Sequence, residues 1–283
     1  MHISMAFLNK GDKVLVPNPG YPTYSSVSKL MGAEIISYDL AEENQWYPDF
    51  EELEKEDLSQ VKIMWVNYPH MPTGAPATMK LFEQLVDFGR RHKILICNDN
   101  PYSLILNPKP MSLLSCPGAK DVVLELNSLS KSHNMAGWRV GMLAGRADYI
   151  QTVLRVKSNM DSGMFLPIQQ AAIEALSNGY KWHEERNEAY RGRREQVWKI
   201  LKLLGCTFQT SQTGMFIWAK IPNNSPSGEH FSEQILNECG VFITPGFIFG
   251  TAGEQYIRIS LCTPASRLEE ATTRISKFQL ASV

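Results

Sequence analysis

The sequence SLSK at residues 128–131, followed by GWRVG at residues 137–141, decides how the fold of this chain is interpreted. It places one amine nucleophile, Lys131, beside two serine hydroxyls and the guanidinium of Arg139. A lysine amine can bond covalently to an aldehyde. Serine hydroxyls and a forked arginine suit a dianionic phosphate better than a lone lysine does. The stretch therefore indicates a ligand that carries both an aldehyde and a phosphate.

Pyridoxal 5'-phosphate (PLP) is a cofactor of this kind, and we predict it from these residues. On its own, an S-x-S-K tetrapeptide is more often a polar loop. The prediction therefore depends on what the rest of the chain supplies.

The composition excludes several classes of partner. The chain has 283 residues, 43% of them hydrophobic and 20% charged, which is enough for one large domain or two unequal ones. A net charge of -1 leaves no basic excess to attract nucleic acid. No apolar run reaches the length of about 20 residues that crosses a bilayer, and the first residues lack the basic start and apolar centre of a signal peptide. We expect a cytoplasmic protein that binds neither nucleic acid nor a membrane.

The cysteines form no C-x-x-C pair and have no histidine at metal-ligand spacing. Neither a disulfide framework nor a metal site is indicated, and we expect all five to be buried free thiols. They are Cys97, Cys116, Cys206, Cys239 and Cys262.

Short apolar or β-branched runs alternate with helical patterns along the first part of the chain. We predict strands over residues 13–17, 34–38, 62–67, 94–98, 122–126 and 139–144. We predict helices over residues 2–8, 24–31, 49–56 and 78–92, the last with a threonine cap. This alternation is typical of an α/β fold, in which helices cover both faces of a mostly parallel sheet.

The pattern changes near residue 181, where one long charged helix is predicted to run to residue 204. Beyond it we predict strands over residues 215–221, 241–244 and 255–261, and helices over residues 229–239 and 266–278. We therefore expect a large domain over residues 1–182 and a small C-terminal α+β domain over residues 183–283.

Polar residues follow the predicted strands of the large domain, where the ligands of open α/β sheets bind. Tyr21 follows the first strand, Asn67 opens a turn-rich loop in which we expect exposed donors, and Asp99 and Tyr102 follow a later strand. Lys131 comes next. Each place taken alone could be a structural turn, but four such coincidences in sequence favour one binding site.

From residue 10 to its last helix, the chain resembles the class I/II aminotransferases, which are PLP enzymes of fold type I. The motifs that carry the resemblance follow the order of that family. They are NPGYP at 18–22, PTG at 72–74, Asp99 to Tyr102, SLSK with Arg139, PG at 245–246, FG at 249–250 and YIR at 256–258.

The resemblance implies a role for each catalytic residue. Lys131 is the Schiff-base lysine, and Asp99 pairs with the pyridine nitrogen and keeps it protonated, which makes the ring a deeper electron sink. Tyr102 donates to the phenolic oxygen of the cofactor.

The resemblance also implies how the ligands are held. Tyr21 stacks on the cofactor ring, while Ser128, Ser130 and Arg139 hold the phosphate. Arg258 binds the α-carboxylate of the substrate through two parallel hydrogen bonds.

The chain departs from the family pattern in two places. The family has Asn before Pro-Thr-Gly as a partner for the phenolic oxygen, and here the residue is Met71, whose sulfur cannot donate. We expect Asn67, His70 or a water molecule to replace it. The chain also begins within a helical pattern, so we expect it to lack the usual N-terminal segment of the family.

The resemblance implies an aminotransferase that moves the amino group of a small amino acid, alanine-like or aspartate-like, to a 2-oxo acid. It also implies a homodimer. Three alternatives stay open: a PLP-dependent C-S β-lyase, a truncated and catalytically impaired chain, and a PLP-sensing binding protein.

Overall fold

The computed structural model of the chain describes residues 1–277, and its larger sheet has six strands in the order β2-β1-β3-β4-β5-β6. The first five strands run parallel, and β6 pairs antiparallel with β5. Their bounds are β1 Lys13–Asn18, β2 Glu34–Asp39, β3 Val61–Val66, β4 Leu95–Asp99, β5 Val123–Ser128 and β6 Gly141–Gly145. The predicted α/β fold with a mostly parallel sheet is confirmed.

Helices cover both faces of this sheet. Alternate residues of each strand enter separate apolar clusters, as Leu15 and its neighbours Val14 and Val16 do. One face carries α4, and the other carries α1, α2 and α6. These helices are α1 His2–Phe7, α2 Thr23–Leu30, α4 Met79–His92 and α6 Ala147–Met160. Burial on both faces explains why the inner strands β1, β3 and β4 are almost continuously apolar in sequence.

The predicted threonine cap is confirmed, and a second helix start has a cap that was not predicted. Thr78 precedes α4, and its side-chain oxygen accepts a hydrogen bond from the backbone N–H of Leu81 at 3.2 Å. Asp49 caps the short α3, Phe50–Leu53, by accepting from the N–H groups of the first turn. Side-chain acceptors of this kind satisfy donors that a helix leaves free at its start.

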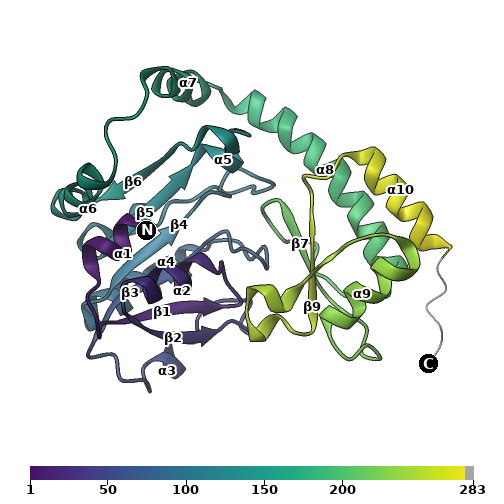
Figure 1. Ribbon diagram of the computed structural model, residues 1–283, viewed down its shortest axis with the longest axis horizontal. Helices are drawn as coiled ribbons and strands as arrows, with labels where there is room; N and C mark the ends of the chain where they lie inside the picture. Colours follow the sequence, from purple (N-terminus) through teal and green to yellow (C-terminus); the bar gives the residue numbers. More distant parts are fainter. Residues whose placement is uncertain (278–283) are drawn as a thin grey trace.

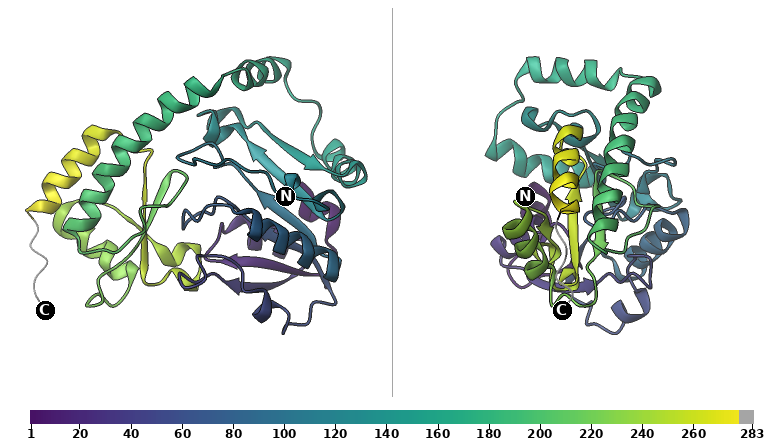
Figure 2. Two further views of the ribbon diagram at one scale, coloured as in Figure 1. Left: turned by 180° about the vertical axis from the view of Figure 1, so that it is seen from behind. Right: turned by 90° about the vertical axis from the view of Figure 1, so that its right-hand side faces the viewer.

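The small sheet has the order β7-β9-β8 and is antiparallel. Figure 1 shows it beside the strand ends of the large sheet, with α8 spanning both parts, and Figure 2 shows α10 lying along α8. The bounds are β7 Phe216–Lys220, β8 Thr244–Pro245, β9 Tyr256–Ser260, α8 Tyr180–Leu203, α9 Gly228–Cys239 and α10 Ala265–Ser276. The long predicted helix is therefore confirmed, and the division at residues 182/183 falls inside it and stays a proposal.

Several predicted elements were wrong in extent. The strand predicted over residues 241–244 is reduced to Thr244–Pro245, because β9 offers pairing partners only to these two residues. Arg139 lies outside β6, since its φ of 54° places it in a left-handed turn. Helix α7, Leu166–Leu176, and α6 occupy a stretch for which we predicted no element. Phe278, the predicted end of the last helix, lies outside the described residues.

The expectation for the cysteines was wrong at one position. Four of the five free thiols are buried, but Cys262 is exposed because it lies in the turn after β9 and not in the sheet. Within residues 1–277, no helix combines the length and the apolar character that crossing a membrane requires.

Candidate active site

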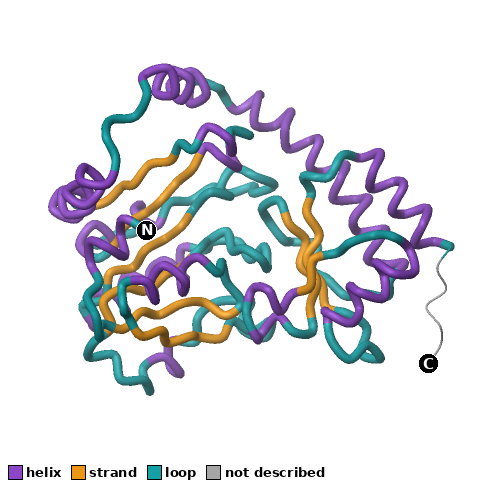
Figure 3. The backbone as a smooth tube through the Cα atoms, viewed as in Figure 1, coloured by secondary structure: helices purple, strands orange, loops and turns teal. Residues whose placement is uncertain are grey.

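A cavity of about 620 Å³ lies where the loops after the large-sheet strands face the small sheet, a side on which loops gather in Figure 3. Its size is within the range of small-molecule sites. All nine side chains singled out from the sequence line it. They are Tyr21, Asn67, Asp99, Tyr102, Ser128, Ser130, Lys131, Arg139 and Arg258.

Asp99 is the carboxylate of the cavity and the last residue of β4. The hydroxyl of Tyr24 donates to its Oδ2 at 2.8 Å, and the side-chain amide of Asn67 donates to its backbone carbonyl. Burial raises the pKa of the Asp99 carboxyl, and the Tyr24 hydrogen bond acts in the opposite direction. A cationic group placed beside this carboxylate would favour the ionised form.

Tyr24 is a cavity residue that the sequence analysis missed. It belongs to α2, is 6% exposed, and stacks on Trp65 with ring centroids 5.0 Å apart and planes at 5°. Burial is the main reason that its pKa lies well above the ordinary tyrosine value, so the phenol stays protonated and donates to Asp99. The available signal was its position two residues after the NPGYP motif.

The lysine loop begins where β5 ends. The Ser128 hydroxyl accepts from the backbone N–H of Ser130 at 3.1 Å and so caps the single helical turn α5, Leu129–Ser132, which carries Lys131. Arg139 is exposed at the rim, and its Nη1 donates to the Ala136 carbonyl at 3.0 Å. Within residues 1–277 it forms no salt bridge, so most of its donors are available to an anion.

Arg258 reaches the cavity from the centre of β9. Its guanidinium carbon lies 4.0 Å from the ring centroid of Phe216 and 4.4 Å from that of Phe249. Burial lowers its pKa, and its Nε is buried without a hydrogen-bond partner. Within residues 1–277 no carboxylate pairs with it. A desolvated guanidinium with free donors is suited to bind a carboxylate.

The loop after β3 differs from its prediction. We expected exposed donors there, but Asn67, His70 and Thr73 are buried because they bond within the loop and to its neighbours. The Asn67 Oδ1 accepts from the N–H of Met71 at 2.9 Å, and His70 Nδ1 lies 2.8 Å from Thr73 Oγ1. Burial lowers the pKa of His70 to about 3, so its imidazole is neutral at ordinary pH.

The sulfur of Met71, a residue that lines the cavity, contacts Arg258. Nη1 of Arg258 lies 3.4 Å from Met71 Sδ, the one side-chain hydrogen bond of this guanidinium within residues 1–277. Both ends of the Asn67 amide are engaged with the main chain, as described above. The replacement for the family's Asn at position 71 therefore stays a prediction.

The two tyrosines predicted to contact a cofactor differ in burial. Tyr21 is 46% exposed and meets Tyr24 edge-on, with centroids 5.6 Å apart. Tyr102 is buried, and burial is the main cause of its raised pKa, so its phenol is a donor at ordinary pH.

Hydrogen bonds join the segment after β1 to the segment between β8 and β9. The N–H of Gly20 donates to the Phe249 carbonyl at 2.8 Å, and Asn18 Oδ1 accepts from the Ala252 N–H at 3.2 Å. At Gly250, φ is +132°, and a Cβ would lie 2.0 Å from Asn18 Oδ1. Only glycine fits there.

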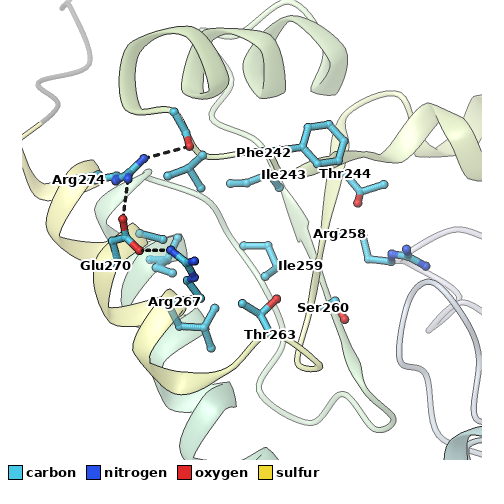
Figure 4. Close-up of a pocket in the computed structure, with 15 residues that line it drawn as sticks. Phe242, Ile243, Thr244, Arg258, Ile259, Ser260, Thr263, Arg267, Glu270 and Arg274 are labelled. Carbon is cyan, nitrogen blue, oxygen red and sulfur yellow. Dashed lines mark hydrogen bonds and ion pairs between the residues drawn. The ribbon is translucent and has the colours of Figure 1, made fainter.

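A second cavity of about 460 Å³ lies within the small domain and is drawn in Figure 4. Arg258 lines both cavities, and the other charged groups of this one satisfy one another, since Glu270 pairs with Arg267 at 2.8 Å and with Arg274 at 2.5 Å. The guanidinium of Arg258 points away from this group in Figure 4. The guanidinium of Arg258, which has no carboxylate partner within residues 1–277, is therefore available to a ligand in the first cavity.

The side chains of the first cavity fit PLP. An amine, a buried carboxylate, and hydroxyl and guanidinium donors for a phosphate surround one space. PLP presents an aldehyde, a ring nitrogen and a phosphate to match these three kinds of group.

Comparison with known proteins agrees with this chemistry. The family described as aminotransferase class I and II matches residues 1–275. An LL-diaminopimelate aminotransferase of Dehalococcoides mccartyi is 39% identical over 283 residues, which is 99% of this chain and 73% of that protein. One from Nitratidesulfovibrio vulgaris is 41% identical over 280 residues, covering 98% of this chain and 72% of that protein.

Solved structures show the same similarity. The BacF structure from Bacillus subtilis without ligand has a TM-score of 0.92 at 37% identity and covers 98% of this chain and 71% of that one. An aromatic aminotransferase from Pyrococcus horikoshii has a TM-score of 0.88 at 32% identity, with 98% and 74% covered. The chain therefore belongs to the class I and II aminotransferase family and is a PLP-dependent transferase.

Proposed function

We propose that this aminotransferase takes the amino group of a small amino acid and transfers it to a 2-oxo acid, with the substrate α-carboxylate on Arg258. The observation that supports this most is the partly buried guanidinium of Arg258, which lacks a carboxylate partner within residues 1–277 and shares a cavity with Lys131 and Asp99. The sequence resemblance favours an alanine-like or aspartate-like substrate. The curated relatives are named for LL-diaminopimelate.

Three residues carry the chemistry in this proposal. When bound, PLP supplies a ring that accepts the electron pair left on the substrate Cα. The amine of Lys131 would bind the cofactor and, once released, would carry the proton from the substrate Cα to C4' of the cofactor. The carboxylate of Asp99, oriented by Tyr24, pairs with the ring nitrogen.

The remaining residues position the ligands. Ser128, Ser130 and Arg139 bind the phosphate through hydroxyl and guanidinium donors. Tyr21 packs on the ring and Tyr102 donates a hydrogen bond to its phenolic oxygen. Asn67 contributes by holding the backbone carbonyl of Asp99 at the end of its strand. We also propose a homodimer, while the cytoplasmic location stays a prediction from sequence.

Replacing the lysine tests the proposal. In Lys131→Ala we expect the visible absorbance of the cofactor-loaded protein to disappear, because no amine remains to bond the aldehyde. Lys199→Ala, a change on the exposed face of α8, is the matched control and should keep the absorbance. Unchanged absorbance in Lys131→Ala would refute the assignment.

The product assay separates transamination from elimination. We expect an oxo acid to form only when an amino acceptor is supplied. Pyruvate and ammonia released without any acceptor would instead identify a C-S β-lyase, because the same lysine and carboxylate serve both reactions. A loaded protein that forms no product in either assay would be the catalytically impaired chain.

A further inference from the structure

Glu125 is a buried carboxylate of β5 that lies behind the site and does not line the cavity. Its Oε2 accepts hydrogen bonds from the side-chain amide of Asn98 at 2.9 Å and from the backbone N–H of Leu113 at 2.7 Å. Its Oε1 accepts a longer one from the side-chain amide of Asn100 at 3.5 Å. Two of these three donors therefore belong to the residues on either side of Asp99.

We propose that Glu125 is a positioning residue for Asp99. By bonding to Asn98 and Asn100, it fixes the backbone of the residue between them and so the direction in which the Asp99 carboxylate points into the cavity. The inference rests on the proposed function, because it takes Asp99 as the partner of the ring nitrogen of PLP. Glu125 itself contacts neither the cofactor nor the substrate.

The first step is the alternation of side chains along a strand. Successive side chains of β4 point to opposite faces of the sheet, and the parallel pairing of β4 with β5 places Asn98 directly beside Glu125. Asn100, just beyond the end of β4, reaches the same carboxylate. Asp99 points to the other face, where it meets the hydroxyl of Tyr24. The carboxylate that faces the ligand is thus held by Tyr24 directly and by Glu125 through both neighbours.

The second step is how completely the end of β4 is fixed. Asn98 donates to Glu125, which leaves its Oδ1 to accept from the backbone N–H of Tyr68 at 3.2 Å. The backbone carbonyl of Asn100 accepts from the side-chain amide of Asn127 at 2.9 Å. Both amides that bond to Glu125 are almost fully buried, at 0% and 2% exposure. Without an acceptor at position 125 these donors would be buried and unpaired, which is unfavourable, so the end of β4 would rearrange.

The third step is the demand that the cofactor makes on this geometry. A hydrogen bond weakens steeply as its angle departs from linearity. A small rotation of Asp99 would therefore weaken its bond to the ring nitrogen. The same rotation would leave the covalent bond to Lys131 and the phosphate contacts in place. Loss of Glu125 should thus affect the recognition of one atom of PLP.

An analogue of PLP that has a carbon atom in place of the ring nitrogen isolates this effect. The analogue keeps the aldehyde and the phosphate, but it cannot form the bond to Asp99. Fluorescence titration of the cofactor-free full chain gives a dissociation constant for the analogue and one for PLP. Their ratio measures how strongly the protein recognises the ring nitrogen. Since both constants are measured on one variant, partial loss of folded protein cancels.

Two variants of similar size separate acceptance of hydrogen bonds from packing. Glu125→Met removes the acceptor, and we expect the ratio to fall by about tenfold, the worth of one hydrogen bond to a charged group. Glu125→Gln keeps one oxygen, which can take the place of Oε2 and accept from Asn98 and Leu113. It should therefore retain most of the ratio. If Glu125→Met does not fold, Asn98→Ala removes one of the two links to Asp99 and should lower the ratio in the same direction.

Ser112→Ala is the matched control. The Ser112 hydroxyl accepts from the backbone N–H of Leu114 at 3.2 Å, in the same loop as Leu113, but it does not bond to β4. This variant should keep the ratio of the unaltered protein.

The outcomes separate the inference from the proposed function. An unchanged ratio in Glu125→Met, or in Asn98→Ala where that variant takes its place, would overturn the inference while the aminotransferase function stands. A fall in Glu125→Gln as large as that in Glu125→Met would also overturn it, because the retained oxygen would then have no effect. If the unaltered protein binds PLP and the analogue equally well, and Asp99→Asn changes neither constant, the failure lies in the proposed role of Asp99 itself.

Discussion

At the scale of single residues, the hydrogen bond from Tyr24 to Asp99 affects the pKa of the carboxyl group in the cavity. The phenol donates to the carboxylate at 2.8 Å and lowers a pKa that burial raises. In Tyr24→Phe we therefore expect the Asp99 pKa to rise further and the cofactor to bind more weakly, by about tenfold, the worth of one hydrogen bond to a charged group. Fluorescence titration with PLP between about pH 6 and pH 8 measures this effect, which should be larger at the lower pH.

Tyr38→Phe is the matched control for this prediction. Tyr38 is a buried tyrosine of β2 whose hydroxyl donates to the Trp65 carbonyl at 2.6 Å, and it does not line the cavity. Its variant should keep the PLP affinity even if stability falls. Equal PLP affinity in Tyr24→Phe and the unaltered protein would rule out a positioning role for Tyr24.

The sequence predicted some residues of the site and missed others. Asp99 and Lys131 were found because each follows a predicted strand, and parallel strands bring their carboxyl ends to one edge of the sheet. Tyr24 was missed because its role depends on the rotation of α2, which turns its hydroxyl towards Asp99. Met71 was recognised as a departure, but its contact with Arg258 joins residues 187 positions apart and has no signal in sequence.

At the scale of elements, the loop after β3 is stabilised by a neutral histidine. His70 is 3% exposed and its pKa is lowered from 6.5 to about 3, so between these values the unfolded chain binds a proton that the folded chain does not. The folded pKa lies below the unfolded one, so this contribution to stability is lost as pH falls from about 6.5 towards 3, by up to about 1.4 kcal/mol per pH unit.

Urea unfolding at several pH values, from about pH 7 to pH 4.5, tests this prediction. His70→Gln lacks the titrating ring, so its free energy of unfolding should fall less steeply on acidification than that of the unaltered protein. Parallel pH profiles for the two proteins would contradict the assignment.

The predicted elements were accurate where the pattern of burial is regular. The strands buried on both faces stand out as short, almost continuous apolar runs, and the second half of the long helix α8 carries an apolar stripe at helical spacing. Strand β8 was predicted too long because an apolar run such as Val241 to Ile243 does not reveal where its neighbouring strand ends. Helix α7 was missed because its apolar residues, such as Ile173 at 69% exposure, do not follow one buried face.

At the scale of the whole molecule, the two sheets share one apolar core. Trp46, from the loop after β2, packs edge-on against Trp218 and Tyr256 of the small sheet, with ring centroids 6.4 and 5.3 Å apart. The same cluster of buried residues includes Leu15 and Ile257. We therefore expect both parts to unfold in a single transition, which tryptophan fluorescence and far-ultraviolet circular dichroism should report at the same denaturant concentration. Two separate transitions would contradict this.

The junction at Gly250 can be tested with a pair of glycine variants. Gly250→Ala should lower the free energy of unfolding by about 2 kcal/mol or more, because φ is +132° and the new Cβ would lie 2.0 Å from Asn18 Oδ1. Gly192→Ala, in α8 with open space around it, should instead raise it by about 0.5 to 1 kcal/mol. Equal effects of the two changes on urea unfolding would mean that the junction tolerates a side chain.

The proposed function depends on one covalent bond between Lys131 and the cofactor. Reducing the PLP-loaded protein with borohydride and mapping its peptides by mass spectrometry locates that bond directly. We predict the mass of the reduced cofactor on the peptide that contains Lys131 and on no other lysine peptide. A modified lysine elsewhere, with Lys131 unmodified, would contradict the account.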